Sequence, residues 1–266
     1  MSNIIQISCL GDMGRFGNQL WQYAFAKTYA NKTNSILEVP ADWIGRRLFN
    51  IEDPVISKQL PRTEIDYMPS GETNIDLYGY YQHQKFADTM DADEVREWYT
   101  FKPEWEEMFP KVKDYYIAAH IRRGDYNVMP SYCTVSVESY RKAIAENGYN
   151  TEDVIEVSEE NKHGLDSRNY DNNKGYYSNI DFLFDFFLVR NADVIFRSNS
   201  TFPWWAAFLS KKGTKIYSPI VQGLAGKREA DAKFVEGNWP CHIEIDDRHS
   251  DLYLGDLMHL IWGRRF

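Results

Sequence analysis

The feature that most constrains the fold of this chain is a regular alternation of short apolar runs with longer helical stretches. A strand predicted over residues 4–10 precedes a Gly-rich loop, and the helix predicted after that loop runs from Asn18 to Ala30. The next apolar run begins at Ser35 and stops at Pro40, which completes a β-α-β unit. With 266 residues, the chain is long enough to repeat this unit in two α/β halves.

The same alternation returns after residue 110. Strands are predicted at 114–121, 153–157, 193–198 and 215–221, and helices at 135–148, 179–192 and 201–213. Strands that alternate with helices favour parallel sheets covered on both faces. We therefore predict an α/β fold of two doubly wound, Rossmann-like domains, residues 1–109 and 110–266, which face each other across a cleft and bind ligands at the carboxyl ends of their strands.

Three stretches give weaker signals. Residues 41–108 are rich in Asp, Glu, Tyr and Trp, and only "IDLYGYYQH" (residues 75–83) is typical of a strand. The polar run from Ser158 to Ser178 contains almost no apolar residue, which predicts a long functional or mobile loop. At the end of the chain we expect a C-terminal helix, with packing against the first domain as one option.

Charge and cysteine content argue against several classes of protein. The 30 Lys and Arg residues against 39 Asp and Glu give a net charge of −9, which disfavours nucleic acid or an anionic membrane as the main partner. Cys9, Cys133 and Cys241 lie far apart without metal-ligand spacing, so we expect free thiols in a reducing compartment. Because the chain has no run of about 18 apolar residues and no secretory signal pattern, we expect a cytoplasmic protein without an integral membrane segment, either free or bound peripherally to a membrane.

The first loop, "GDMGRFGNQ", places Gly11, Gly14 and Gly17 three residues apart. Glycine at this spacing permits a tight turn and a close approach of the backbone to a ligand. The spacing is neither the dinucleotide fingerprint nor a Walker loop. An ordinary strand-to-helix turn explains the pattern equally well.

The second loop, "SNSTFP", carries Ser200 and Thr201 just before Pro203. This order is typical of capping hydroxyls followed by a proline in the first turn of a helix. The unpaired N–H groups of such a helix start bind phosphate. An ordinary capped helix is the alternative.

The third loop, "HIRRGDY", places His120, Arg122, Arg123 and Asp125 within six residues of a strand end. Two adjacent arginines usually await an anion, either a carboxylate of the same protein or a phosphate of a ligand. An ion pair of Arg123 with Asp125 would fix the loop. Because side chains alternate along an extended chain, the other arginine would then remain for a ligand.

These loops together resemble the α-1,2-fucosyltransferase family (glycosyltransferase family 11). "HIRRGDY", "GRFGNQLWQYAFAK" and "SNSTFPWWAAFL" match its three motifs in order, and "DFFLVRNADVIFRSN" resembles its acidic helix. The "GRFGNQ" stretch is also similar to protein O-fucosyltransferases. The resemblance implies a GT-B-like architecture that uses GDP-fucose without a metal, inverts the anomeric centre and forms an α-1,2 linkage to galactose or a similar sugar.

The resemblance also implies roles for individual residues. Arg122 would contact the diphosphate, Ser200 and Thr201 would bind phosphate from the other side, and His120 and Asp185 would hold the guanine or its ribose. The full set of implied donor-binding residues is Arg15, Phe16, Asn18, His120, Arg123, Asp185, Asn199, Ser200, Thr201 and Phe202, with Arg122 and Asp125 as catalytic candidates. Asp125 and Asp12 are both candidates for the general base. The first domain would face the acceptor, and the second would bind the nucleotide sugar.

Other functions remain open. The donor could be another nucleotide sugar, and the acceptor could be a protein, a polysaccharide or a lipid-linked glycan. A nucleotide-sugar or glycan-binding module without turnover is the alternative from another class. We expect no metal, since the one Asp-x-Asp triplet, Asp91 to Asp93, is typical of an acidic helix N-terminus.

Overall fold

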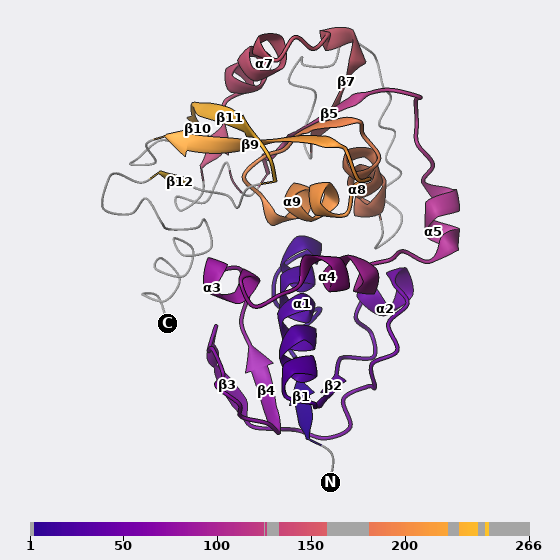
Figure 1. Ribbon diagram of the computed structural model, residues 1–266, viewed down its shortest axis with the longest axis vertical. Helices are drawn as coiled ribbons and strands as arrows, with labels where there is room; N and C mark the ends of the chain where they lie inside the picture. The colour runs from indigo at the N-terminus through magenta and orange to yellow at the C-terminus, as the bar shows by residue number, and fades with distance from the viewer. Residues whose placement is uncertain are drawn as a thin grey trace. The chain divides into compact units, whose positions relative to one another are not determined.

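Two sheets made mainly of parallel strands organise the chain (Figure 1). The computed structural model describes residues 3–124, 126, 133–158, 181–222, 229–238 and 243–244. The chain divides into two units, Met1–Met108 and Phe109–Phe266. Each unit contains one of these sheets, and the second also contains a separate pair of short parallel strands at residues 134–135 and 229–230. Four predicted features lie outside the described residues: Asp125, one of the two candidates for the general base, the loop beyond Ser158, Cys241 and the C-terminal helix.

Unit 1 is a four-stranded parallel sheet with helices between its strands. In chain order its elements are β1 (Ile4–Gln6), α1 (Phe16–Lys32), β2 (Ile36–Glu38), α2 (Gly45–Leu48), β3 (Arg62–Ile65), β4 (Ile75–Tyr78), α3 (Gln84–Ala87), α4 (Ala92–Trp98) and α5 (Pro103–Met108). The strand order is β2-β1-β4-β3, and every pair is parallel. The short elements of residues 41–108, which gave a weak sequence signal, therefore complete the first sheet and flank it with short helices.

Helix α1 is the central support of unit 1, and it packs against β1 and β2. Two glutamines on α1 are buried and hold the Gly-rich loop: the Gln19 amide donates to the Gly14 carbonyl at 3.2 Å, and the Gln22 amide donates to the Met13 and Gly79 carbonyls at 3.0 Å each. Buried amides need such partners. The loops after β1 and β4 are thereby fixed to one helix.

Two predicted strands of unit 1 end earlier than the sequence indicated. The strand predicted over residues 4–10 ends at Gln6, because the Ser8 N–H donates to the Asp76 carboxylate (2.8 Å) instead of to a strand carbonyl. The strand predicted over 75–83 ends at Tyr78. There the Asp66 carboxylate accepts hydrogen bonds from the N–H groups of both Tyr80 (2.6 Å) and Tyr81 (2.8 Å), which turns the chain.

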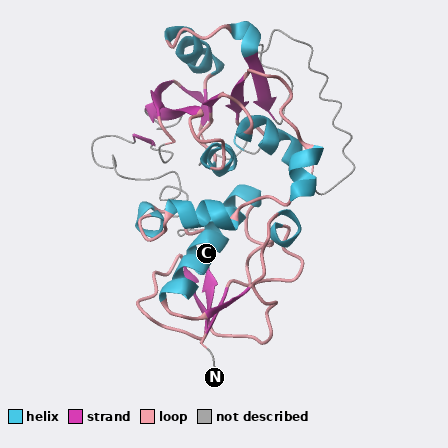
Figure 2. Cartoon of the chain, turned by 45° about the vertical axis from the view of Figure 1, so that its right-hand side comes forward, coloured by secondary structure: helices cyan, strands magenta, loops and turns pink. Residues whose placement is uncertain are grey.

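Unit 2 is built on a six-stranded mixed sheet. In chain order its elements are β5 (Ile117–Ile121), β6 (Thr134–Val135), α7 (Val137–Glu146), a 3₁₀ turn (Thr151–Asp153), β7 (Val154–Ser158), α8 (Phe182–Arg190), β8 (Val194–Phe196), α9 (Thr201–Phe208), β9 (Lys215–Gln222), β10 (Glu229–Ala230), β11 (Ala232–Glu236) and β12 (Ile243–Glu244). The order β11-β9-β8-β5-β7 is parallel except for β11, and β12 also pairs with β9. Figure 2 shows helices on both sides of this sheet.

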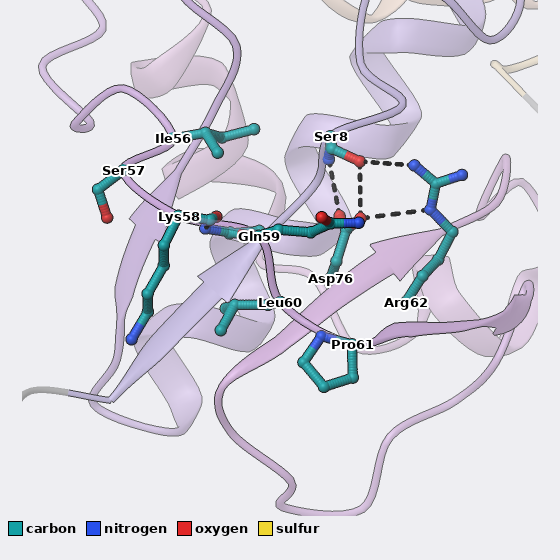
Figure 3. Close-up of a pocket in the computed structure, with 10 residues that line it drawn as sticks. Ser8, Ile56, Ser57, Lys58, Gln59, Leu60, Pro61, Arg62 and Asp76 are labelled. Carbon is teal, nitrogen blue, oxygen red and sulfur yellow. Dashed lines mark hydrogen bonds and ion pairs between the residues drawn. The ribbon is translucent and has the colours of Figure 1, made fainter.

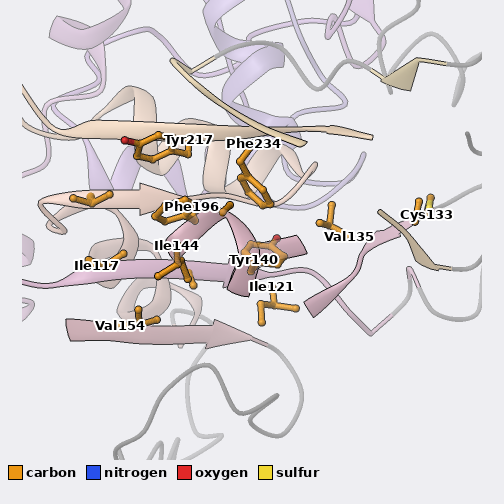
Figure 4. Packing of buried hydrophobic residues seen from close by; sticks show 14 residues of the cluster. Ile117, Ile121, Cys133, Val135, Tyr140, Ile144, Val154, Phe196, Tyr217 and Phe234 are labelled. Atoms are coloured by element: carbon orange, nitrogen blue, oxygen red, sulfur yellow. The ribbon is translucent and has the colours of Figure 1, made fainter. Parts of the chain in front are cut away.

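The core of unit 2 lies between α7 and the sheet (Figure 4). The Phe196 and Tyr217 rings stack at 4.6 Å, and Tyr140 of α7 packs 4.8 Å from Phe234 of β11. Ile117 and Ile121 of β5 belong to this cluster. Because strand side chains alternate, the even-numbered residues of β5 point to the opposite face of the sheet.

None of the helices in the described part of the chain combines the length and the apolar character needed to span a bilayer.

Candidate functional site

A topological switch point lies between β5 and β8. From β5 the chain passes to β7 on one side and then returns to place β8 on the other side of β5. Sheets of this kind form a crevice outside the carboxyl ends of the two strands at such a point. The loops that begin after Ile121 and after Phe196 are those that carry the second and third sequence motifs.

His120 is directed to the face of the sheet that α9 covers. Its ring centroid lies 5.7 Å from that of Phe202, and its Nδ1 lies 3.0 Å from the Ser198 hydroxyl. The Tyr140 hydroxyl donates to the His120 carbonyl at 2.8 Å. His120 is 6% exposed, so packing against Phe202 and the hydrogen bond with Ser198, in the loop after β8, both fix the imidazole.

The two adjacent arginines have different surroundings, although both are buried. The Arg123 guanidinium donates to the Arg122 carbonyl (2.9 Å), the Val135 carbonyl (3.1 Å) and the Glu229 carboxylate (3.0 Å). The Arg122 guanidinium lies over the Tyr126 ring at 4.7 Å. The described ion pair of Arg123 is with Glu229, from β10, whereas the predicted partner Asp125 lies outside the described residues.

Helix α9 begins beside the loop that carries Arg122 and Arg123, and no side chain caps its first turn. Ser200 occupies the N-cap position with extended backbone angles, but its hydroxyl accepts no capping hydrogen bond, contrary to the expectation that it caps the helix. An N-cap oxygen usually accepts from the N–H of the second or third helical residue, and here the third is Pro203, which has none. The first-turn N–H groups of this helix therefore retain their capacity to bind an anion.

The segment before α9 contains four buried polar residues, Arg197, Ser198, Asn199 and Ser200. The Asn199 amide donates to the Cys133 carbonyl at 2.9 Å, and its oxygen has no hydrogen-bond partner among the described residues. The Arg197 guanidinium is fully buried and donates to the Ser198 carbonyl at 3.0 Å. Sequence reasoning missed Arg197 and Ser198, because it placed both inside the strand predicted over 193–198, whereas β8 ends at Phe196.

Phe202 and Asp185 complete the part of the site in unit 2. Phe202 makes edge contacts with the rings of Phe186 (5.4 Å) and Phe182 (6.5 Å), so α8 packs beside the start of α9. Asp185 lies on α8 between these two phenylalanines. The structure thus brings together His120, Arg122, Arg123, Asn199, Ser200, Thr201 and Phe202 around one switch point, with Asp185 on the helix alongside.

The remaining candidates belong to unit 1. Arg15 is the N-cap residue of α1, and the Asn18 side chain accepts from the Arg15 N–H at 3.2 Å. The Phe16 ring is buried and stacks against Phe49 at 6.4 Å, which gives it a place in the core of unit 1. Asp12 is exposed in the turn before α1.

No cluster of three or more His, Cys, Asp or Glu side chains suited to a metal occurs among the residues that the structure describes. The acidic triplet has the structural role that its sequence indicated. Asp91 is the N-cap of α4, and its carboxylate accepts from the N–H groups of Asp93 and Glu94 at 3.0 Å each.

Comparison with known proteins relates the fold to that of two solved structures. No family model and no curated protein sequence matches the chain. The crystal structure of the NodZ α-1,6-fucosyltransferase soaked with GDP-fucose matches 89% of this chain and 100% of its own, at 13% identity and a TM-score of 0.51. The crystal structure of fucosyltransferase NodZ from Bradyrhizobium matches 82% of this chain and 95% of its own, at 14% identity and a TM-score of 0.51. The chain therefore has a GT-B-like α/β fold.

Proposed function

We propose that the chain is a glycosyltransferase that transfers fucose from GDP-fucose to a hydroxyl group of a glycan acceptor. The observation that carries the proposal is the combination, at one switch point, of the buried Arg122 and the uncapped start of α9. Both features favour a diphosphate. The GDP-fucose soaked into the NodZ crystal of the same fold supports the choice of donor.

The proposed reaction is a displacement at the anomeric carbon with inversion. As the bond from that carbon to the diphosphate oxygen breaks, the leaving GDP gains negative charge, which Arg122 and the first-turn N–H groups of α9 stabilise. The attacking acceptor hydroxyl gives its proton to a carboxylate, for which Asp125 and Asp12 are the candidates. No step requires a metal, so we propose a metal-independent enzyme.

His120, Phe202 and Asp185 are proposed to bind the nucleoside. His120 and Phe202 lie on one face of the sheet, and Asp185 lies on the helix that packs against Phe202. Arg123 is proposed to support the loop through its three hydrogen bonds. Arg15, Phe16 and Asn18 are proposed to act from the acceptor-side unit.

The linkage is proposed to be α-1,2, on the strength of the three sequence motifs. The NodZ structures come from an α-1,6 enzyme, so the fold is compatible with more than one linkage. A transferase that uses another nucleotide sugar or a protein acceptor is the alternative enzyme, and a non-catalytic nucleotide-sugar-binding module is the alternative outside enzymes.

The test is a thermal-shift screen of GDP-fucose, GDP, GDP-mannose and UDP-sugars, followed by a transfer assay with excess EDTA. A ligand that binds only the native state raises the melting temperature. GDP-fucose and GDP should stabilise the wild type, and Arg122→Ala should abolish this shift. Arg141→Ala, which removes an exposed arginine of α7, is the charge-matched control and should leave the shift unchanged.

Each alternative gives a different result in the same experiment. A larger shift with a UDP-sugar would identify another donor, and binding of GDP-fucose without transfer to any glycan would favour a binding module. Loss of transfer in EDTA that manganese restores would contradict metal independence. Linkage analysis of the product by NMR would decide between α-1,2 and other positions.

A further inference from the structure

A row of polar side chains crosses the sheet of unit 1. Its members are register partners on neighbouring strands: Glu38 of β2, Gln6 of β1, Asp76 of β4 and Arg62 of β3. Residues paired in register lie on the same face of a sheet. The first three are buried, although both faces of a parallel sheet are usually apolar. The buried polar side chains of this row need hydrogen-bond partners on the same face of the sheet.

Residues 56–61 pass over this row, and one end of the segment is tied to the sheet. The Glu38 carboxylate accepts from the Gln6 amide (2.7 Å), the Ser57 hydroxyl (2.7 Å) and the Ser57 N–H (3.1 Å). The Gln6 amide also donates to the Lys58 carbonyl at 2.8 Å. Burial alone would raise the pKa of the Glu38 carboxyl, but the hydrogen bonds from Ser57 and Gln6 outweigh it and hold the pKa below its ordinary value.

The other end of the row is a second hydrogen-bonded group, shown in Figure 3. The Ser8 hydroxyl donates to Asp76 at 2.6 Å and accepts from the Arg62 guanidinium at 3.0 Å, and Arg62 also donates to Asp76 at 3.3 Å. The guanidinium lies over the Tyr78 ring, 4.7 Å from its centroid. These contacts fix the orientation of a side chain that is half exposed.

A cavity of about 670 Å³ lies between the two ends, under residues 56–61. Its volume falls within the range of roughly 300–1,000 Å³ typical of small-molecule pockets. Its wall combines Gln6, Asp76 and Arg62 of the polar row with the apolar side chains of Ile56, Leu60 and Pro61. The Gln59 side chain is exposed at this wall, and no described residue hydrogen-bonds its amide. None of the candidate donor-binding residues lines the cavity.

Three charged side chains line the cavity: Lys58, Arg62 and Asp76. Arg62 is paired with Asp76, and the charge of Lys58 lowers the pKa of the Glu38 carboxyl, which lies outside the lining. A phosphate or another anion would compete with Asp76 for Arg62. A neutral ligand that both donates and accepts hydrogen bonds suits this wall better, since Gln59, Ser8 and Arg62 offer both kinds of group.

We propose that this cavity binds one sugar unit of a neutral oligosaccharide. Sugar hydroxyls donate and accept hydrogen bonds, and the C–H faces of a sugar ring pack on apolar side chains such as Leu60 and Pro61. The inference goes beyond the proposed fucosyl transfer. It rests on that proposal only where the bound sugar is taken to be part of the acceptor. That sugar belongs either to a distant part of the acceptor or to a separate glycan.

The test uses the full chain and an array of immobilised neutral oligosaccharides, with calorimetry on the glycans that bind. Gln59→Ala and Arg62→Gln should each weaken binding about tenfold or more, which corresponds to about 1.4 kcal/mol. Glu64→Ala changes an exposed residue of β3 outside the cavity and is the control that should bind like the wild type. Melting curves verify that each variant is folded.

The inference is overturned if the wild type binds no neutral oligosaccharide, if both cavity variants bind normally, or if inorganic phosphate binds at Arg62 and sugars do not. GDP-fucose is titrated into the same samples. Binding of glycans that depends on Gln59, in a chain that neither binds nor consumes GDP-fucose, would support this inference while the proposed function fails. Fucosylation of the bound glycan would identify it as the acceptor, and binding without fucosylation would identify a separate glycan.

Discussion

At the scale of single residues, Arg122 and Arg123 show how two identical neighbours in the sequence can have different surroundings. Arg123 makes three hydrogen bonds within unit 2, and two of them go to backbone carbonyls. Such bonds stabilise a loop whether or not a ligand is bound. The sequence predicts one structural and one ligand-binding arginine, and the ligand-binding role of Arg122 stays a prediction. The partner Glu229 could not be predicted, since it is 106 residues away from Arg123.

Arg123→Ala is expected to lower the free energy of unfolding by about 1–3 kcal/mol, because it leaves the buried Val135 carbonyl without its donor. Urea unfolding followed by circular dichroism measures the change. Arg141→Ala, on the surface of α7, should change stability by no more than about 0.5 kcal/mol. An Arg123→Ala variant as stable as this control would show that Arg123 is not structural.

The general base is a second question at this scale. We expect Asp12→Asn and Asp125→Asn each to retain more transfer than Arg122→Ala, because leaving-group stabilisation contributes more than either carboxylate. Loss of transition-state charge stabilisation typically costs about 10²-fold or more in rate. Single-turnover rates of the three variants provide the comparison. A variant that binds GDP normally but is as inactive as Arg122→Ala would identify that aspartate as the base.

Cys9 gives a prediction for alkaline pH. Burial raises the pKa of its thiol from 9.0 to about 11, so the native state keeps a proton that the unfolded chain loses. Stability from this group is therefore complete below pH 9 and declines up to about pH 11. Over that interval the wild type should lose about 2–3 kcal/mol relative to Cys9→Ala, at 1.36 kcal/mol per unit. Urea unfolding of both proteins measures this loss. If the free energy of unfolding changed equally in the wild type and in Cys9→Ala over the same interval, the raised pKa of Cys9 would be contradicted.

At the scale of elements, the sequence locates β1, β4 and β8, although each has only three or four residues, but it predicts each of them too long. The end of α7 can be predicted, because Gly148 follows its last turn with φ 72°, and so can the acidic cap of α4. The four residues of β3 carry too few positions to show a period. The ends of such short strands depend on side chains from elsewhere, as Asp66 shows when it ends β4.

The turn after β4 can be tested at Gly79. A Cβ at this position would meet the Asp66 carboxylate and lie 2.5 Å from the Asp66 backbone nitrogen, so Gly79→Ala must displace the residue that holds the turn. We expect a loss of about 1–3 kcal/mol in the free energy of unfolding. Gly71→Ala is the control: it also has a positive φ, but its Cβ would meet nothing within 4 Å. Equal losses in the two variants would exclude the contact as the cause.

At the scale of the whole molecule, a chain with an acidic net charge contains a local cluster of basic side chains. The chain carries −9 overall, yet Arg122, Arg123 and Arg197 gather at one switch point in unit 2. The sequence predicts Arg122 and Arg123 at this point because their motif follows a strand, and the carboxyl ends of parallel strands meet, but it missed Arg197. It could not predict the cavity of unit 1, since that wall joins strand residues to the irregular segment 56–61.

Each of the two units can be tested for GDP binding as a separate fragment. The candidates for nucleotide binding in unit 2 lie on a sheet with its own core, which includes Tyr140 and Phe234. A fragment of residues 109–266 should therefore fold and bind GDP, whereas residues 1–108 should not bind GDP, and neither fragment alone should transfer fucose. Calorimetry with GDP on each fragment checks the first two expectations. Arg122→Ala in the larger fragment is the control and should abolish binding. If the folded larger fragment fails to bind GDP while the full chain does, unit 1 contributes directly to the nucleotide site, and Arg15 and Asn18 become the first residues to test there.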